Sequence, residues 1–245
     1  MIKKGVYAAS VSVLNNDKSL DINSTINHAE SAIKSGLHGA FFFGSTGQSQ
    51  LLSISEKKDL ISKTATSKFR DQFYFGTGTN SLKDNLDLIR YCMEFGYQTF
   101  LIMPPAYYKG NTHKGVYNFY AAIIAQVPKI KIILYNFEKL SGYLFSTEAV
   151  KNLVKDFPKQ IIGCKDSSYN LFEALKIPNF KMFPGSEAKL FNGLELGCSG
   201  CISAITNVTH SLARKVFDDF ENKTSQTVNE KVIKVRQTFD QYPLI

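Results

Sequence analysis

Short runs of apolar residues alternate with longer amphipathic segments along the chain. The apolar runs predict eight strands, at residues 6–11, 39–43, 73–76, 99–103, 130–135, 161–165, 180–183 and 201–203. Apolar residues at helical spacing predict helices at residues 22–35, 55–67, 81–95, 115–126, 146–156, 171–176, 187–196 and 209–222. One further helix is expected at residues 228–240.

Continuously apolar strands separated by helices are typical of a parallel sheet that is covered by helices. Eight of them predict an α/β fold, the (β/α)₈ TIM barrel, with the catalytic barrel at residues 1–223 and a short C-terminal helical extension at 224–245. A doubly wound open sheet is the alternative. That fold usually carries a phosphate loop after its first strand, and no GxGxxG motif follows residues 6–13.

Composition excludes several classes of protein. The chain has 245 residues, 44% of them hydrophobic, as in ordinary globular proteins. No stretch approaches the roughly 18 apolar residues of a membrane span. The four cysteines are scattered through apolar segments and are expected to be free thiols in a reducing cytoplasm. We therefore expect a cytoplasmic protein that does not bind membranes.

The net charge of +8 does not by itself indicate nucleic-acid binding. The lysines are spread along helices among acidic residues, and no basic run is interleaved with aromatic residues, so a solvated lysine-rich surface is expected. A positive field still helps to attract a small carboxylate substrate. The four histidines lack ligand-type spacing, so no metal site is expected.

Lys165 stands where a reactive lysine is expected. It ends the apolar run Ile161–Cys164 and is followed by the polar turn Asp166–Ser168. In such a barrel the active site lies at the carboxyl ends of the strands. A lysine at the end of a buried strand loses hydration, which favours the neutral amine, a nucleophile toward carbonyl carbons. Most strand-end lysines make ordinary surface or ion-pair contacts, so this interpretation depends on the other strand ends.

Polar residues also follow other predicted strands. After the second strand, the turn Gly44–Ser49 carries hydroxyl groups and backbone N–H groups that suit a carboxylate or phosphate. The fifth strand ends in Tyr135, one strand away from Lys165. The remaining candidates at strand ends are Tyr107, Tyr108, Gly185 and Ser203. Taken singly, a turn of this kind is more often a plain turn between strand and helix, and tyrosine pairs after a strand usually pack. The small residues around the last strand could equally serve packing alone.

Together these residue types suit the chemistry of a keto acid. A neutral lysine condenses with the keto group to form an iminium ion, which withdraws electrons from the adjacent carbon–carbon bond. A phenol within reach carries the proton that bond cleavage or formation requires. Ser45 and Thr46 can orient the carboxylate and pass protons through their hydroxyl groups. This chemistry needs no metal and no other cofactor.

At these motifs the sequence resembles the dihydrodipicolinate synthase/N-acetylneuraminate lyase family. The resemblance is carried by Gly44-Ser45-Thr46-Gly47, Tyr135-Asn136 and Gly163-Cys164-Lys165-Asp166-Ser167-Ser168, and it extends from about Gly5 to Tyr242. It is specific, because three motifs fall on three predicted strand ends. It implies a (β/α)₈-barrel class I aldolase or lyase that acts on pyruvate or on products that release it.

The resemblance also implies a role for each candidate. It implies Lys165 as the Schiff-base residue, Tyr135 as the acid/base, and Ser45 and Thr46 as carboxylate and relay groups. In synthases of this family a tyrosine after the fourth strand reaches the neighbouring subunit's site, so a homo-oligomer, dimer or tetramer, is expected. Tyr108 fits that place best and Tyr107 second. The predicted catalytic residues are Lys165, Tyr135, Thr46 and Tyr108, and the predicted substrate-binding residues are Ser45, Gly47, Tyr107, Gly185 and Ser203.

The chain departs from the family pattern at several positions. Gln48 stands where the family usually has glutamate. Glu138 stands two residues after Tyr135-Asn136, where the family usually has a proline. Lysine-pathway synthases have an arginine shortly after Tyr-Asn, whereas residues 139–142 here read Lys-Leu-Ser-Gly, similar to neuraminate lyases. The helical extension of the family is shortened after Tyr242-Pro243.

We therefore expect reversible cleavage of a 2-keto-3-deoxy sugar acid, or of an N-acetylneuraminate-like substrate, to pyruvate and an aldehyde. One alternative is 4-hydroxy-tetrahydrodipicolinate synthase, which condenses pyruvate with aspartate semialdehyde. Another is a non-catalytic member of the family. Lys165 and Tyr135 favour an enzyme, whereas Gln48, Glu138 and the short C-terminus favour the non-catalytic alternative. Loop shape, which sets the choice of aldehyde, is not readable from the sequence.

Overall fold

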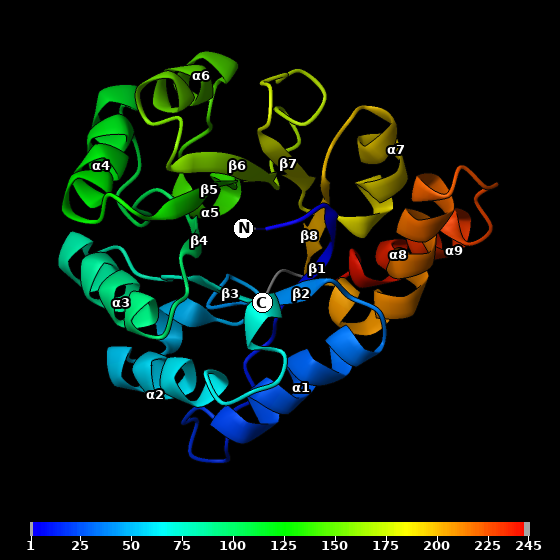
Figure 1. Cartoon of the computed structure of the whole chain (residues 1–245), viewed down its shortest axis with the longest axis horizontal. Helices are drawn as coiled ribbons and strands as arrows, with labels where there is room; N and C mark the ends of the chain where they lie inside the picture. The colour runs from blue at the N-terminus through cyan, green and yellow to red at the C-terminus, as the bar shows by residue number, and fades with distance from the viewer. Residues whose placement is uncertain (1, 243–245) are drawn as a thin grey trace.

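Eight parallel strands form the centre of the molecule and helices surround them (Figure 1). The computed structural model describes residues 2–242; residues 1 and 243–245, which the predicted domains include, lie outside this range. The strands are β1 (Gly5–Ala9), β2 (Gly39–Phe42), β3 (Phe73–Gly76), β4 (Thr99–Ile102), β5 (Lys131–Asn136), β6 (Ile161–Asp166), β7 (Lys181–Pro184) and β8 (Gly200–Ser203).

Helices follow most of these strands, with two between β5 and β6 and none in the described segment between β6 and β7. They are α1 (Ile22–Lys34), α2 (Ile54–Thr64), α3 (Leu82–Glu94), α4 (His113–Gln126), α5 (Glu138–Ser141), α6 (Thr147–Asp156), α7 (Leu190–Glu195), α8 (Thr206–Glu221) and α9 (Asn229–Phe239). The 3₁₀ turns are η1 (Ser49–Leu51), η2 (Arg70–Gln72) and η3 (Glu187–Lys189). Five helices begin where a side-chain oxygen caps the first turn, at Asp21, Ser53, Ser81, Thr112 and Ser146. Among residues 2–242, no helix has both the length and the apolar character to cross a membrane.

The order of the strands confirms the predicted barrel. The hydrogen-bonded order is β7-β6-β5-β4-β3-β2-β1-β8, and every pair is parallel. The ring is completed beside β7 and β8, where the Ser199 N–H donates to the Met182 carbonyl oxygen at 2.7 Å. Because β1 pairs with both β2 and β8, the first and last strands are neighbours, unlike those of an open doubly wound sheet.

Two hydrophobic clusters make up the core. One fills the barrel interior with large side chains that include Tyr7, Phe41, Leu101, Ile133 and Phe183. The larger cluster lies between the strands and the helices. Alternate residues of each strand therefore face one cluster or the other, which explains why the strands are apolar throughout.

The predicted helix at residues 171–176 is wrong. The segment is a turn that contains a single helical hydrogen bond, from the Leu175 N–H to the Leu171 carbonyl oxygen. The Asp166 carboxylate accepts the backbone N–H groups of Leu171 and Phe172 at 2.8 and 2.9 Å. These bonds hold the segment against the end of β6, and its single turn does not continue into a helix.

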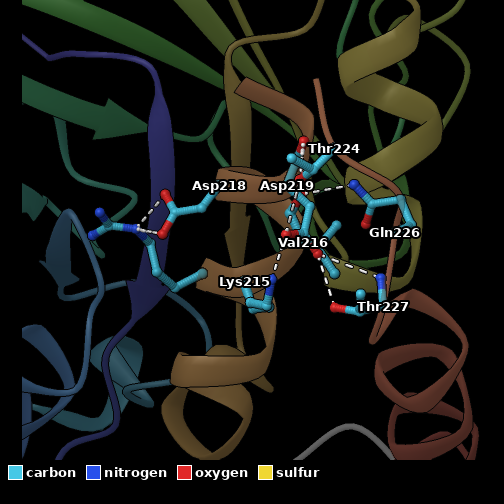
Figure 2. Close-up of polar contacts among 8 residues, drawn as sticks. Lys215, Val216, Asp218, Asp219, Thr224, Gln226 and Thr227 are labelled. Atoms are coloured by element: carbon cyan, nitrogen blue, oxygen red, sulfur yellow. Dashed lines mark hydrogen bonds and ion pairs between the residues drawn. The ribbon is translucent and has the colours of Figure 1, made fainter. Parts of the chain in front are cut away.

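The connection between α8 and α9 is held by Asp219 (Figure 2). Its carboxylate accepts hydrogen bonds from Lys215, from Thr227 Oγ1 at 3.0 Å and from Thr224 Oγ1 at 3.3 Å. The bond from Lys215 first, and then that from Thr227, lowers the pKa of Asp219 below its ordinary value. They set the direction in which α9 leaves α8, and α9 packs against α8 and η3 at the barrel. A division into a barrel and a separate extension at residue 224 stays a prediction.

Candidate active site

Lys165 and Tyr135 lie side by side at the carboxyl ends of β6 and β5. The parallel register pairs Tyr135 with Lys165 directly. Lys165 Nζ donates a hydrogen bond of 3.2 Å to the Tyr135 hydroxyl and lies 4.3 Å from the centroid of the ring. Lys165 is only 3% exposed. The pairing of the two strands, rather than a loop, brings the amine and the phenol together.

Ser45 extends this contact to the turn after β2. Its Oγ lies 2.9 Å from the Tyr135 hydroxyl, so the three polar groups of Lys165, Tyr135 and Ser45 form a continuous chain. The turn is fixed by Gly47, where a Cβ atom would lie 2.9 Å from the Ser10 carbonyl oxygen. Ser12 Oγ also donates to the Gly47 carbonyl oxygen at 2.7 Å. Gly47 therefore has a structural role that explains the residue type.

Asp166 and Asn136, the next residues along β6 and β5, anchor the two catalytic candidates. Both are fully buried, and Asn136 Nδ2 donates to Asp166 Oδ1 at 2.8 Å. The Asn136 carbonyl oxygen accepts the Ser167 N–H at 2.8 Å. These bonds restrict the strand ends on which Lys165 and Tyr135 lie.

A cavity of about 850 Å³ opens at this end of the barrel. Ser45, Thr46 and Tyr135 line it on the side of β2 and β5, and Arg236, Phe239 and Asp240 line it on the side of α9. Leu140, in the segment that lacks the arginine of the synthases, also lines it. The volume suits a small-molecule substrate.

Not every predicted site residue lies at the reacting groups. Thr46 lines the cavity, but the Tyr135 hydroxyl bonds to Ser45 and Lys165. Gly185 is packed against Ser167, whose Oγ would lie 2.1 Å from a Cβ atom at that position. Packing therefore accounts for this glycine without a ligand.

Ser203 is fully buried at the end of β8 and donates its hydroxyl hydrogen bond to Glu187. Its contact is thus with another side chain of the barrel.

Tyr107 and Tyr108 are the most exposed of the predicted site residues, with 78% and 80% of their surfaces accessible. Their rings contact one another edge to face, with centroids 5.2 Å apart. Neither ring lines the cavity formed by residues 2–242. The contribution of one of them to a neighbouring subunit's site stays a prediction.

The structure adds an ionic group that the sequence did not reveal. Glu187 in η3 is fully buried, and its Oε2 lies 3.7 Å from Nη1 of Arg236 in α9. Arg236 Nε also donates to Asp240 Oδ1 at 2.7 Å. Glu187 follows β7 and could have been found by the rule that selects polar residues after strands. Arg236 lies on a helix outside the strand pattern and has no such signal.

Comparisons with known proteins identify the family of the chain. The dihydrodipicolinate synthetase family matches residues 3–244. A 4-hydroxy-tetrahydrodipicolinate synthase of a Hydrogenobaculum species is 33% identical over 184 residues, 73% of this chain and 62% of that protein. A 2-dehydro-3-deoxy-D-gluconate/2-dehydro-3-deoxy-phosphogluconate aldolase of Picrophilus torridus is 28% identical over 210 residues, 84% of this chain and 74% of that protein.

A solved structure has the same fold. The 2-keto 3-deoxygluconate aldolase from Picrophilus torridus superposes with a TM-score of 0.86 at 24% identity and covers 99% of this chain and 89% of that one. The expected class, a carbon–carbon lyase, is confirmed at the level of the family, whose members are lyases and aldolases. The match to residues 3–244 shows that the chain belongs to the dihydrodipicolinate synthetase family.

Proposed function

We propose that this chain is a class I, Schiff-base aldolase that cleaves a 2-keto-3-deoxy sugar acid, or a sialic-acid-like substrate, to pyruvate and an aldehyde. The observation that carries the proposal is the contact of Lys165 Nζ with the Tyr135 hydroxyl, 3.2 Å apart at the mouth of the barrel. A buried amine beside a phenol supplies the nucleophile and the proton carrier that this reaction needs.

The first step is formation of the Schiff base. The amine of Lys165 attacks the keto carbon through its lone pair, the Tyr135 hydroxyl gives its proton to the departing oxygen, which leaves as water, and a protonated imine joins Nζ to the substrate while Tyr135 is left as the phenolate. Ser45 lies 2.9 Å from the Tyr135 hydroxyl, so protons can pass between these two groups during the step. The turn after β2 also presents backbone N–H groups that suit the substrate carboxylate.

The second step breaks the carbon–carbon bond. The Tyr135 phenolate formed in the first step accepts the proton of the hydroxyl group on carbon 4, the bond between carbons 3 and 4 breaks, and the aldehyde is released. The electron pair moves into the iminium ion and leaves an enamine. Protonation of carbon 3 and hydrolysis of the imine then release pyruvate and regenerate the free amine.

The cavity wall supports a sugar acid over aspartate semialdehyde. A synthase has to bind the carboxylate of the semialdehyde, and a bidentate arginine is the side chain suited to that task. Leu140 lines the cavity in the segment where the synthases carry this arginine. An apolar wall at this place does not bind a carboxylate.

Borohydride reduction in the presence of pyruvate tests the proposal. A reduced pyruvyl adduct is expected on the peptide that contains Lys165, together with loss of activity. Lys165→Met is the matched control, and Lys57, which is also fully buried, should stay unmodified. Absence of the adduct from the unsubstituted protein would favour the non-catalytic alternative.

A further inference from the structure

The cavity lining contains two charged side chains among the described residues, and they are paired with each other. They are Arg236 and Asp240 on α9, joined by a hydrogen bond of 2.7 Å from Nε to Oδ1. The other lining residues are neutral. The cavity wall therefore presents no free cationic side chain to a substrate within residues 2–242.

A second carboxylate lies behind this pair. Glu187 is fully buried and its Oε2 is 3.7 Å from Arg236 Nη1, while its Oε1 has no hydrogen-bond partner within residues 2–242. Burial raises the pKa of Glu187 above its ordinary value. With Glu187 protonated, Arg236 is balanced by Asp240 alone; with Glu187 ionised, the three side chains sum to one negative charge. In neither state does this wall carry net positive charge.

The remaining polar side chains of the wall are hydroxyl groups and amides. They include Thr46, Gln48, Gln50 and Thr79. These groups both donate and accept hydrogen bonds, so they suit the hydroxyl groups of a sugar chain. A phosphate dianion instead needs charge-assisted donors to offset the loss of its hydration.

We propose that the aldehyde half of the substrate is an uncharged, polyhydroxylated aldehyde. Glu187 and Asp240 exclude phosphorylated aldehydes, because they pair with the guanidinium of Arg236 and make it unavailable to a phosphate. The inference rests on the proposed function and narrows its substrate. Glu187 acts through Arg236 and is a positioning residue. Asp240 and Arg236 contribute to the cavity wall itself.

One other cation lies near the rim. Lys109 is exposed, and its Nζ lies 3.4 Å from the carbonyl oxygen of Leu140, a residue of the cavity wall. It is the side chain best placed to receive a phosphate from outside the lining. Lys109→Gln therefore separates a rim contribution from that of Arg236.

The test compares the addition of pyruvate to D-glyceraldehyde and to D-glyceraldehyde 3-phosphate. We expect kcat/KM to be at least about tenfold higher for the uncharged aldehyde. This is the factor that one charge-assisted hydrogen bond typically contributes. In the double variant Glu187→Gln/Asp240→Asn, which releases Arg236, the ratio should shift at least about tenfold toward the phosphorylated aldehyde, mainly through KM.

Glu230→Gln removes one carboxylate from the exposed first turn of α9 and serves as the charge control; it should leave the ratio unchanged. Should the double variant fail to fold, Asp240→Asn alone changes a side chain that is 55% exposed and should shift the ratio in the same direction. A preference of the unsubstituted protein for the phosphorylated aldehyde overturns the inference, and so does an unchanged ratio in the folded variants. If Lys109→Gln alone abolishes use of the phosphorylated aldehyde, the assignment to Arg236 is wrong.

Trapping of pyruvate on the same preparations separates this inference from the proposed function. An adduct on Lys165 together with preference for the phosphorylated aldehyde overturns the inference and leaves the Schiff-base chemistry in place. Absence of the adduct overturns both. An adduct on a protein that turns over neither aldehyde counts against the inference, because an uncharged aldehyde is then not accepted.

Discussion

Nζ of Lys165 donates its hydrogen bond to the hydroxyl of Tyr135 from the directly paired position of the neighbouring strand. The two side chains therefore share a geometry that is fixed by backbone pairing. Changes in either side chain alter the chemistry of the pair more than the fold, because the strands are held by their own hydrogen bonds. This relationship makes the pair suited to mutational tests.

Tyr135→Phe should reduce turnover by about 10²–10⁴-fold, the usual contribution of a general acid–base group. The ring is retained, so the barrel should stay folded and pyruvate should still be trapped on Lys165, at a lower rate. Turnover and borohydride trapping are measured on one preparation. Nearly full activity of the variant would show that Tyr135 only packs against the lysine.

Ser45→Ala should reduce turnover more than Thr46→Val does. Ser45 Oγ lies 2.9 Å from the Tyr135 hydroxyl, and loss of a hydrogen bond to a group that becomes charged costs about 1.5–3 kcal/mol, roughly tenfold to hundredfold in rate. Thr46→Val keeps the shape of the side chain and serves as the matched comparison. A larger loss of turnover in Thr46→Val would show that Thr46, and not Ser45, passes the proton.

Turnover of aspartate semialdehyde should be poor, because Leu140 lines the cavity and belongs to the segment after Tyr-Asn in which the resemblance leads us to expect an arginine in the synthases. The missing charge-assisted contact corresponds to about 2–3 kcal/mol, or about a hundredfold in selectivity against the semialdehyde. Leu140→Arg should recover part of that factor, measured as kcat/KM for the semialdehyde relative to an uncharged aldehyde. Efficient condensation by the unsubstituted protein would contradict the assignment, and Lys139→Gln would then test whether Lys139 supplies the charge.

The barrel, and the closeness of Tyr135 to Lys165, could be predicted from the sequence. Consecutive apolar strands in a barrel are neighbours, so residues at the ends of β5 and β6 had to lie close together, as Tyr135 and Lys165 do. The apolar spacing at residues 171–176 gave a wrong helix, because the hydrogen bonds that fix this segment come from Asp166, outside the local pattern. Periodicity carries no information about such a contact.

The ionic group at the cavity wall was hidden for a related reason. Glu187 and Arg236 are brought together only by the packing of α9 against η3, which depends on how the Asp219 contacts direct the chain after α8. Residue spacing does not encode that direction. The exposed positions of Tyr107 and Tyr108 likewise depend on the path of a loop, which the strand pattern leaves free.

Lys57 provides a prediction about stability rather than catalysis. It is 1% exposed in α2, and its Nζ donates to the carbonyl oxygens of Thr77 and Gly78 at 3.2 and 2.9 Å. Burial lowers the pKa of Lys57 from 10.5 to about 8. Because a buried ammonium group is less stable than a solvated one, the folded protein releases this proton at a lower pH than the unfolded chain does.

The sign of the resulting pH dependence follows from the proton count. Between about pH 8 and pH 10.5 the unfolded chain binds more protons at Lys57 than the folded protein, so this residue makes the free energy of unfolding rise with pH. Lys57→Met removes that contribution and leaves two carbonyl oxygens without their donor. The free energy of unfolding of the unsubstituted protein, minus that of Lys57→Met, should therefore increase by up to about 3 kcal/mol across this window.

Urea unfolding of both proteins at pH 7.5, 9 and 10.5 measures this difference. Lys58→Met, at the neighbouring position and paired with Asp87 on the surface, is the control and should show no such increase. A difference that stays constant with pH would mean that Lys57 keeps its proton throughout and that its two hydrogen bonds outweigh the effect of burial.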